Sequence, residues 1–405
     1  MLGTFICWYD FIIFGLATPL VFHQLFFPNL SFVIPILVFA VGFVIRPLGS
    51  IVFGHIGDKI GRKPVLIATM LITGVGTVCI GLLPTYADIG VLAAILLVAL
   101  RVAQSFALGG EQGAGSTILV EHNVNSPRRG FIASIVNSNW AAASLTASGI
   151  FALVTSFGTE FFLSYGWRIP FLLSAILVLL CLYIRVTVQE TPVFKKLQES
   201  DQVSKSPIKE LIVTNWKKLT LSTAMYMISG LYIYGITVFG FAYLVSNGTP
   251  RAELSQTWFY LTPVTLVGIA FFGWLGDKIG RVKVFQAYTI LSVVFVYPIF
   301  YWISQGNIVL PIIFGVSIIM AAAFGCAPGF FTEIFPANVR QTSSGLIMNF
   351  GTMIGGGLAP VVAQLIYDNT KSITSVAHFV TAVSIVSLIA MWKLSRDKNL
   401  IVQPV

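Results

Sequence analysis

Charged residues are scarce in this chain, and their scarcity excludes an ordinary water-soluble protein. Asp, Glu, Lys and Arg make up only 10% of the 405 residues, whereas apolar residues make up 56%. A soluble domain usually carries about 25% charged residues. It also has no need of many apolar runs of about 20 residues, which a bilayer requires. The composition therefore predicts a polytopic membrane protein whose main partner is the lipid bilayer.

Several functional motifs are also missing. The four cysteines (Cys7, Cys79, Cys181 and Cys326) lie singly in apolar segments, so they indicate neither a disulfide framework nor a metal site. The chain has no Gly-rich phosphate loop ending in Lys-Ser/Thr, which ATP-driven transport would need. It has no cluster of His and Cys for a metal or haem, and no nucleophile–base pair. We therefore expect no enzyme and no cofactor.

Twelve apolar segments are long enough to be membrane helices, because each backbone polar group in lipid needs an internal partner. The first begins almost at Met1, and Asp10 within it argues against a signal peptide. One long polar segment, 189–217, separates a half at 1–188 from a half at 218–394, and 395–405 would form a tail. The predicted helices span 2–24, 31–56, 64–84, 89–120, 130–156, 168–188, 218–246, 255–276, 283–303, 308–331, 341–367 and 374–394.

The basic residues are distributed unequally between the two sides of these predicted helices. If both termini face the cytoplasm, 19 of the 24 Lys and Arg residues lie in cytoplasmic loops or ends. Only Arg168, Arg251 and Lys371 lie on the other side. The positive-inside rule explains this asymmetry and the net charge of +9, so a nucleic-acid partner is not needed to account for them.

A charged phrase occurs twice, 219 positions apart, as GHIGDKIGRKP at 54–64 and GWLGDKIGRVK at 273–283. Each copy follows the second predicted helix of its half. The repeat therefore indicates an internal duplication, and two related six-helix halves are one architecture of secondary transporters.

These motifs resemble the loop signature G-x-x-x-D-x-x-G-R-[RK] of the major facilitator superfamily. The matching residues are Gly54, Asp58, Gly61, Arg62 and Lys63 in the first copy, and Gly273, Asp277, Gly280 and Arg281 in the second. The resemblance implies an all-α major facilitator fold with twelve transmembrane helices. Further stretches resemble the metabolite:proton symporters of that superfamily: WYDF at 8–11, GFVIRPLGSIVFGHIGD at 42–58, RVAQSFALGGEQG at 101–113, GWRIPF at 166–171, ETPVF at 190–194 and TEIFPANVRQTSSGL at 332–346.

This closer resemblance implies symport of small organic acids or zwitterions with protons in a bacterial cytoplasmic membrane, driven by the proton gradient. The sequence departs from the family pattern at Cys7, where a Glu is usual, and at Ser105 and Gln112. A uniporter or antiporter of the same fold, or an inactive or shortened member, therefore stays open. The protein is expected to act as a monomer.

The repeated loops suit a gate that holds the cytoplasmic side shut. Asp58 could lie at the N-terminus of a helix from the other half, and Arg62 could reach an acid such as Glu121. A merely basic cytoplasmic loop would explain Arg62 and Lys63, but neither the spacing nor the recurrence.

Four ionisable residues lie well inside predicted helices: Asp10, Arg46, Arg101 and Glu111. Because burying charge in lipid is costly, each is a candidate functional residue. A proton carrier needs a carboxylate whose surroundings change during the cycle, which makes Asp10 and Glu111 candidates. A guanidinium can bind a carboxylate in bidentate fashion, which suits Arg46 and Arg101 for substrate or relay. A static neutral network of two acids and two bases is the alternative.

On the fourth predicted helix, Arg101, Gln104, Ser105, Glu111 and Gln112 share one face at about 100° per residue. That stripe predicts a polar path, or else a polar contact between helices. Further substrate candidates are polar residues on other predicted helices. They are Asn137, Asn139, Trp140, Tyr226, Tyr232, Tyr234, Asn349 and Gln364.

Overall fold

The computed structural model describes residues 2–28, 33–123, 125–187 and 189–396. Every regular element in these ranges is a helix. The predicted boundary at 188 and most of the predicted tail at 395–405 fall outside the described residues. The domain boundaries accordingly stay predictions.

Among the described residues, the first part of the chain contains six α-helices of more than ten residues, together with short α-helices and π-helical turns, which are labelled η. They are α1 (Leu2–Ala17), η1 (Thr18–Phe22), α2 (His23–Leu25), α3 (Val33–Ile60), α4 (Arg62–Leu82), α5 (Tyr86–Ile89), α6 (Val91–His122), α7 (Arg129–Thr155), α8 (Thr159–Phe161), η2 (Phe162–Gly166) and α9 (Arg168–Thr187).

The linker and the second part follow the same pattern. They contain α10 (Pro192–Glu199), α11 (Pro207–Thr214), α12 (Trp216–Tyr234), η3 (Gly235–Gly240), α13 (Phe241–Ser246), α14 (Arg251–Ile279), α15 (Arg281–Val294), α16 (Val296–Ser304), α17 (Val309–Pro311), η4 (Ile312–Met320), α18 (Ala321–Ile334), α19 (Arg340–Thr352), η5 (Met353–Leu358), α20 (Ala359–Thr370) and α21 (Ile373–Arg396).

The predicted all-helical membrane fold is confirmed. Among the described residues, eight helices are long and apolar enough to cross a bilayer, or ten if each of two bent pairs is one span. Two shorter apolar helices, Gly3–Ala17 and Arg168–Tyr183, coincide with the first and sixth predicted spans. The count of twelve spans stays a prediction.

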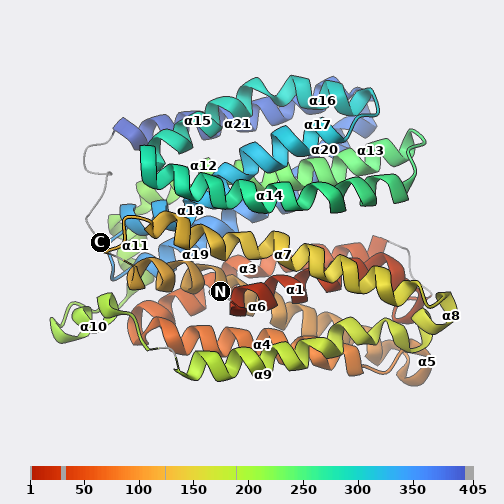
Figure 1. Cartoon of the computed structure of the whole chain (residues 1–405), viewed down its shortest axis with the longest axis horizontal. Helices are drawn as coiled ribbons and strands as arrows, with labels where there is room; N and C mark the ends of the chain where they lie inside the picture. Colours follow the sequence, from red (N-terminus) through yellow and green to blue (C-terminus); the bar gives the residue numbers. More distant parts are fainter. Residues whose placement is uncertain (1, 29–32, 124, 188, 397–405) are drawn as a thin grey trace.

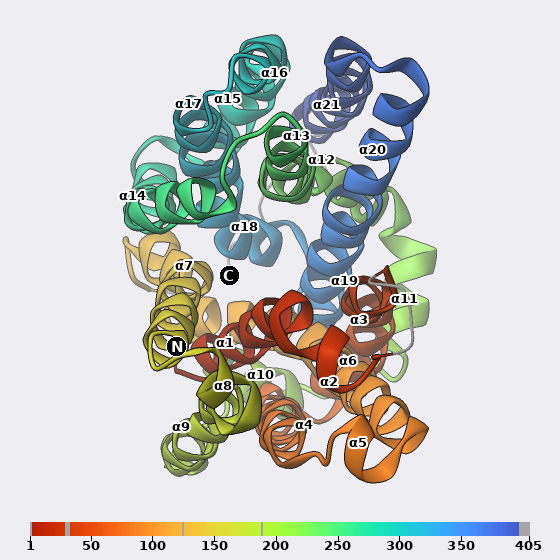
Figure 2. The same ribbon diagram turned by 90° about the vertical axis from the view of Figure 1, so that its right-hand side faces the viewer.

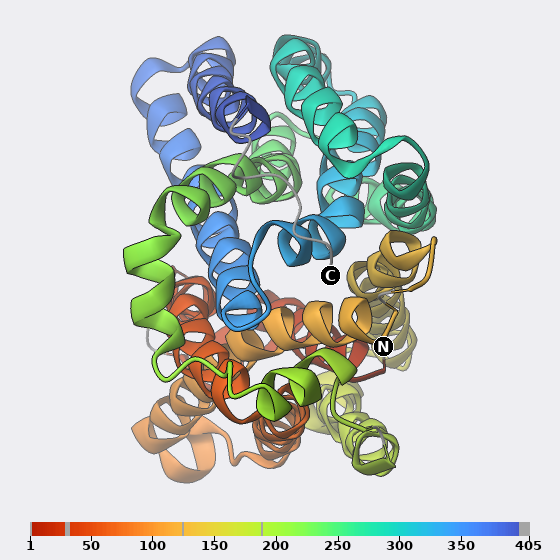
Figure 3. The same ribbon diagram turned by 90° about the vertical axis from the view of Figure 1, so that its left-hand side faces the viewer.

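The helices form two groups that run along the long axis of the molecule. Figure 1 shows α1 to α9 in its lower part and α12 to α21 in its upper part, and Figure 2 shows the same two groups end-on. Contacts between the groups run mainly through α7 against α14 and α18, and through α19 against α3 and α6. The linker helices α10 and α11 cross one end of the molecule, seen in green in Figure 3.

A glycine in a positive-φ conformation separates the two helices on either side of each repeated loop. Gly61 joins α3 to α4 with φ 119°, and Gly280 joins α14 to α15 with φ 97°. Residues with a Cβ rarely adopt this conformation. The glycines of the motif therefore permit the tight turn that places both loops at the end crossed by α10 and α11.

The glycine cluster in η5 is a point of close packing. A Cβ at Gly355 would overlap the carbonyl oxygen of Met227 on α12, and one at Gly230 would lie 2.7 Å from the backbone nitrogen of Gly356. Small residues allow membrane helices to approach this closely.

We expect Gly355→Ala to destabilise the protein by about 1–3 kcal/mol, because added volume in a packed contact forces the helices apart. Thermal unfolding of the purified protein in detergent measures the effect. Gly149→Ala is the matched control, since no atom of any residue described in the structure lies within 4 Å of a Cβ at that position. Equal melting temperatures for the two variants would contradict close packing at η5.

Candidate functional site

The first repeated loop joins the two halves through Asp58. The Asp58 carboxylate accepts hydrogen bonds from the backbone N–H of Gln341 (3.1 Å) and of Thr342 (2.8 Å) in the first turn of α19. It is fully buried, and Arg62 lies 3.3 Å from it. A carboxylate at a helix N-terminus satisfies N–H groups that have no partner within the helix and interacts favourably with the helix dipole.

Arg62 also reaches Glu121, as the sequence suggested. Its Nε lies 3.3 Å from Glu121 Oε2, and its Nη2 donates to the carbonyl of Ala337 at 2.7 Å in the other half. Arg340, the first residue of α19, pairs with Glu121 at 3.2 Å. We call the cluster of Asp58, Arg62, Glu121 and Arg340 the first latch.

The second repeated loop forms the same arrangement with the roles of the two halves exchanged. Asp277 accepts hydrogen bonds from the backbone N–H of Gly130 (2.9 Å) and of Phe131 (2.8 Å) in the first turn of α7. Arg281 pairs with Asp277 at 2.6 Å and with Glu333, and Arg129 at the start of α7 pairs with Glu333 at 2.5 Å. The cluster of Asp277, Arg281, Glu333 and Arg129 is the second latch.

Each latch depends on a glycine that brings two helices from opposite halves into contact. A Cβ at Gly54 would lie 2.8 Å from Thr342 Cα, and a Cβ at Gly273 would overlap Ser134 on α7. Buried ion pairs of this kind are costly to break on one side, because the remaining charge is left unpaired. The two latches therefore fasten the halves to each other at one end, which we call the latch end.

Two buried arginines flank one aromatic ring near the middle of the molecule. The Cζ atoms of Arg46 and Arg101 lie 4.0 and 4.5 Å from the centre of the Phe11 ring, one from α3 and the other from α6. Phe43 lies 5.0 Å from Arg46, and Phe14 lies 4.2 Å from Arg101. Cation–π attraction of this kind stabilises a cation without neutralising it.

Arg46 lacks a counter-ion in the described part of the chain. It is 1% exposed, and none of its three guanidinium nitrogens has a hydrogen-bond acceptor among the described residues. A buried cation is expensive unless an anion pairs with it. Tyr234 of α12 is within electrostatic range of both Arg46 and Arg101, so the second half also faces this pair.

The two candidate proton carriers have different surroundings. Ser174 of α9 donates a hydrogen bond of 2.6 Å to one carboxylate oxygen of Asp10, and the other oxygen has no described partner. Both oxygens of Glu111 accept hydrogen bonds, from Thr69 at 2.9 Å and from Thr4 at 3.4 Å. Neither Asp10 nor Arg46 takes part in an ion pair within the described residues. Within the described part of the chain, no static ion-pair network therefore links those two residues.

The polar stripe of α6 is buried between helices of the first half. Gln104 donates to Thr77 of α4 at 2.7 Å, and Glu111 contacts the same helix through Thr69. Ser105 instead faces α3, where a Cβ at Gly42 would lie 2.9 Å from its hydroxyl. The alternative of polar contacts between helices accounts for these three residues.

Two predicted substrate residues make hydrogen bonds between the halves. Asn137 of α7 donates to the carbonyl of Phe324 at 2.6 Å, and Asn349 of α19 donates to the carbonyl of Gly109 at 3.0 Å. Gln112 is buried, and its side-chain carbonyl has no partner among the described residues. Tyr232 donates to the carbonyl of Ser292 within the second half.

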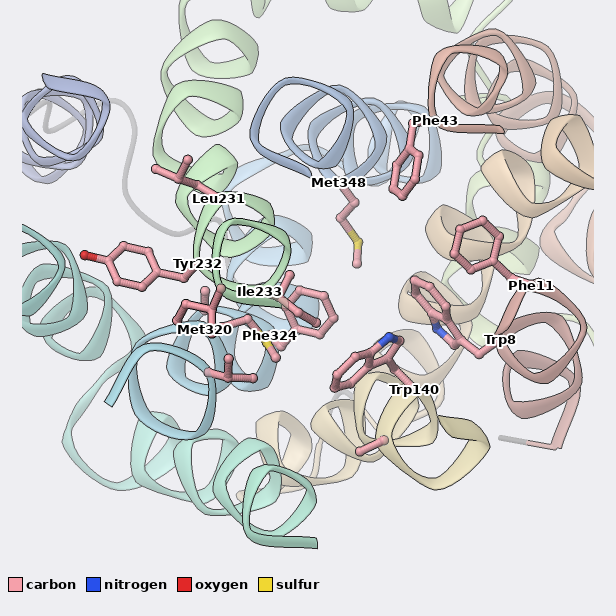
Figure 4. Close-up of a cluster of buried hydrophobic side chains, with 14 of the residues drawn as sticks. Trp8, Phe11, Phe43, Trp140, Leu231, Tyr232, Ile233, Met320, Phe324 and Met348 are labelled. Carbon is pink, nitrogen blue, oxygen red and sulfur yellow. The ribbon is translucent and has the colours of Figure 1, made fainter. Parts of the chain in front are cut away.

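A cavity of about 750 Å³ lies between the halves, on the side away from the latch end. Volumes of this size suit small-molecule ligands. Figure 4 shows Trp8, Phe11 and Phe43 facing Ile233, Phe324 and Met348 across the space between the halves. Among the described residues, the cavity is lined by Phe11, Ile12, Gly15, Leu16, Trp140, Ser144, Ser148, Gly149, Phe151, Ala152, Ile233, Tyr234, Thr237, Val238, Phe241, Ser255, Gln256, Trp258, Phe259 and Tyr260.

Sequence reasoning found Trp140 and Tyr234 in this lining but missed several neighbours. Trp258 of α14 packs against Trp140 with ring centres 6.0 Å apart, and Gln256, two residues before Trp258, also lines the cavity. It also missed Arg129, Arg340 and Glu333 as latch partners. The internal repeat could have found these, since Arg129 and Arg340 begin corresponding helices.

Comparison with known proteins shows the family and the fold. The pattern of the Major Facilitator Superfamily matches residues 1–360. An inner membrane metabolite transport protein, YhjE of Escherichia coli K12, is 34% identical and aligns with 96% of this chain and 91% of its own length. The shikimate transporter of the same bacterium is 33% identical over 89% of this chain and 85% of its own. A structure of the proton:xylose symporter XylE, also from E. coli, superposes with a TM-score of 0.76 at 15% identity, covering 99% and 95% of the two chains.

Proposed function

The chain belongs to the Major Facilitator Superfamily of transporters, and from this premise we propose that it couples proton entry to uptake of a small carboxylate-bearing metabolite. It is a multi-pass membrane protein and not an enzyme. The substrate would be an organic acid or a zwitterion. Transport would take place in a bacterial cytoplasmic membrane, with both termini and the latch end facing the cytoplasm and the proton gradient as the energy source.

The observation that carries this proposal is the buried Arg46 guanidinium without a counter-ion among the described residues. A substrate carboxylate entering from the cavity between the halves would supply the missing anion by bidentate hydrogen bonding. Phe11 lines the cavity and its ring also contacts the Arg46 guanidinium, so this ring separates the cavity from Arg46. Movement of this ring would bring the substrate carboxylate to Arg46 and, beyond it, to Arg101.

The different structures of the two ends of the molecule suit a transporter that opens to each side of the membrane in turn. The latches close one end, while the cavity between the halves lies toward the other. Binding of substrate and proton would favour release of the latches and the opposite state, because a ligand shifts populations by its differential affinity for the two states. A uniporter or antiporter would use the same latches without the proton step, and an inactive member would move nothing.

We expect de-energised, lightly buffered cells containing the protein to alkalinise the medium when pooled organic acids and betaines are added. Splitting the pool then identifies the substrate. Arg46→Gln should abolish the signal at the same substrate concentration, and Arg46→Lys, which keeps the charge but loses the planar fork, should weaken it.

Wild-type protein that reaches the membrane yet moves no protons would rule out symport. Counterflow of labelled acids would then separate the remaining possibilities: exchange without proton movement indicates a uniporter or antiporter, and no exchange indicates an inactive member.

A further inference from the structure

The two latches are not equivalent, because the linker supplies an additional carboxylate to the first one. Glu190 accepts hydrogen bonds from the backbone N–H of Arg62 (3.1 Å) and of Lys63 (3.0 Å), the first two residues of α4. Phe194 places its ring 4.8 Å from the Arg62 guanidinium. The N-terminus of α4 is thus bound by a carboxylate and an aromatic ring that come from outside the repeated motif.

At the corresponding point of the second latch, α15 begins without such a cap. No described residue accepts a hydrogen bond from the backbone N–H of Arg281 or Val282. The side chain of Arg281 is only 8% exposed, and its Nε, like that of Arg62, is buried without a hydrogen-bond acceptor among the described residues. A Cβ at Gly61 would meet Glu190 and Phe194, whereas no atom of a described residue lies within 4 Å of a Cβ at Gly280.

A cavity of about 780 Å³, which we call the α15 cavity, occupies this place. Its walls come from both halves, with Asn125, Ser126 and Pro127 of the loop before α7 on one side. On the other side they include apolar side chains of α18 and α21. Those apolar residues are Phe330, Ile334, Met391 and Leu394.

We propose that the α15 cavity binds a carboxylate that carries an apolar or aromatic body, in the way that Glu190 and Phe194 bind at α4. The free N–H groups at the start of a helix and the helix dipole attract an anion. Lys283 adds positive charge, whereas Arg281 already pairs with Asp277 and Glu333 in the second latch. The apolar wall receives the body of the ligand.

Binding at this site stabilises the closed latch end. Because both halves line the α15 cavity, it exists in this form only while the halves are together, and a ligand that binds one state shifts the population toward it. In the proposed orientation the cavity faces the cytoplasm. A carboxylate accumulating in the cell therefore holds the transporter shut at its cytoplasmic end, as a feedback on uptake.

The test uses 3-phenylpropionate as the probe and 3-phenylpropanamide as its neutral match, with the full chain in nanodiscs and no proton gradient. Ser134→Cys, in a background with the four native cysteines replaced by Ala, reports opening, because Ser134 is buried against Gly273 of the other half. At ten times its Kd, the acid should slow alkylation of this cysteine about tenfold, because the open population falls by 1 + [L]/Kd. The amide should have no effect.

Two variants locate the effect in the α15 cavity. Gln286→Trp fills the cavity from a position outside both latches and should abolish the slowing. Lys283→Ala leaves the cavity open and should raise the acid concentration needed to slow alkylation by the same factor. Slowing that persists unchanged in Gln286→Trp would place the acid elsewhere and overturn the proposal, as would the absence of slowing in the parent protein. Neither readout requires transport, so failure here is separate from failure of the proposed symport.

The carboxylate could also come from the chain itself, since Asp397 directly follows α21. A variant ending at Arg396 distinguishes the two sources. If a free acid is the ligand, truncation leaves the alkylation rate of Ser134→Cys unchanged both with and without added acid. If Asp397 occupies the cavity, truncation speeds alkylation and added acid restores the slow rate.

Discussion

Asp58→Asn is expected to open the latch end of the transporter. The substitution preserves the shape of the side chain but removes the negative charge of the carboxylate. That carboxylate accepts hydrogen bonds from two backbone N–H groups of α19 and pairs with Arg62. Hydrogen bonds to a charged group contribute about 1.5–3 kcal/mol, so the ratio of open to closed molecules should rise about 10- to 100-fold. The alkylation rate of Ser134→Cys measures this ratio directly.

Asp277→Asn is the matched variant, because Asp277 occupies the equivalent place at the start of α7. It should open the same end by a similar factor, and the double variant should open it further. Lys59→Gln in the same loop, exposed and outside both latches, is the control and should change nothing. An Asp58→Asn protein with unchanged alkylation would show that the cluster holds the fold together without controlling access.

The repeated motif made the latch contacts predictable, whereas the interior required the structure. A loop that recurs at the same place in two halves must meet corresponding elements, so Asp58 at a helix N-terminus and Arg62 near Glu121 followed from spacing and chemistry. The additional carboxylate at Glu190 did not follow, because its position depends on how the linker folds back onto α4.

The polar stripe of α6 shows a second limit. Angles along a helix grouped Gln104, Ser105 and Glu111 on one face, but they do not say which neighbouring helix each residue meets. In the structure Gln104 and Glu111 contact α4, while Ser105 faces α3. The sandwich of Phe11 between two arginines depends likewise on the rotation of three helices.

Asp10→Asn is expected to uncouple uptake from the proton gradient. Asp10 is buried next to Phe11 in the chain, and one of its oxygens has no described partner, whereas both oxygens of Glu111 are engaged. Of the two acids, Asp10 can therefore gain or lose a proton with less disruption of neighbouring contacts, which makes it our choice as proton carrier. Asn keeps the shape and can still accept the Ser174 hydrogen bond, but it cannot release a proton.

A one-unit pH gradient supplies about 1.4 kcal/mol per coupled proton, which supports roughly tenfold accumulation of a substrate that carries no net charge with its proton. Proteoliposomes with wild-type protein should reach such a ratio, and Asp10→Asn should equilibrate the substrate at a ratio near one while retaining counterflow. Ser174→Ala is the matched control: it removes the 2.6 Å hydrogen bond but keeps the carboxylate, so accumulation should persist. If Asp10→Asn still accumulates substrate and Glu111→Gln does not, the proton is carried on α6, and the buried threonine pair around Glu111 forms part of its path.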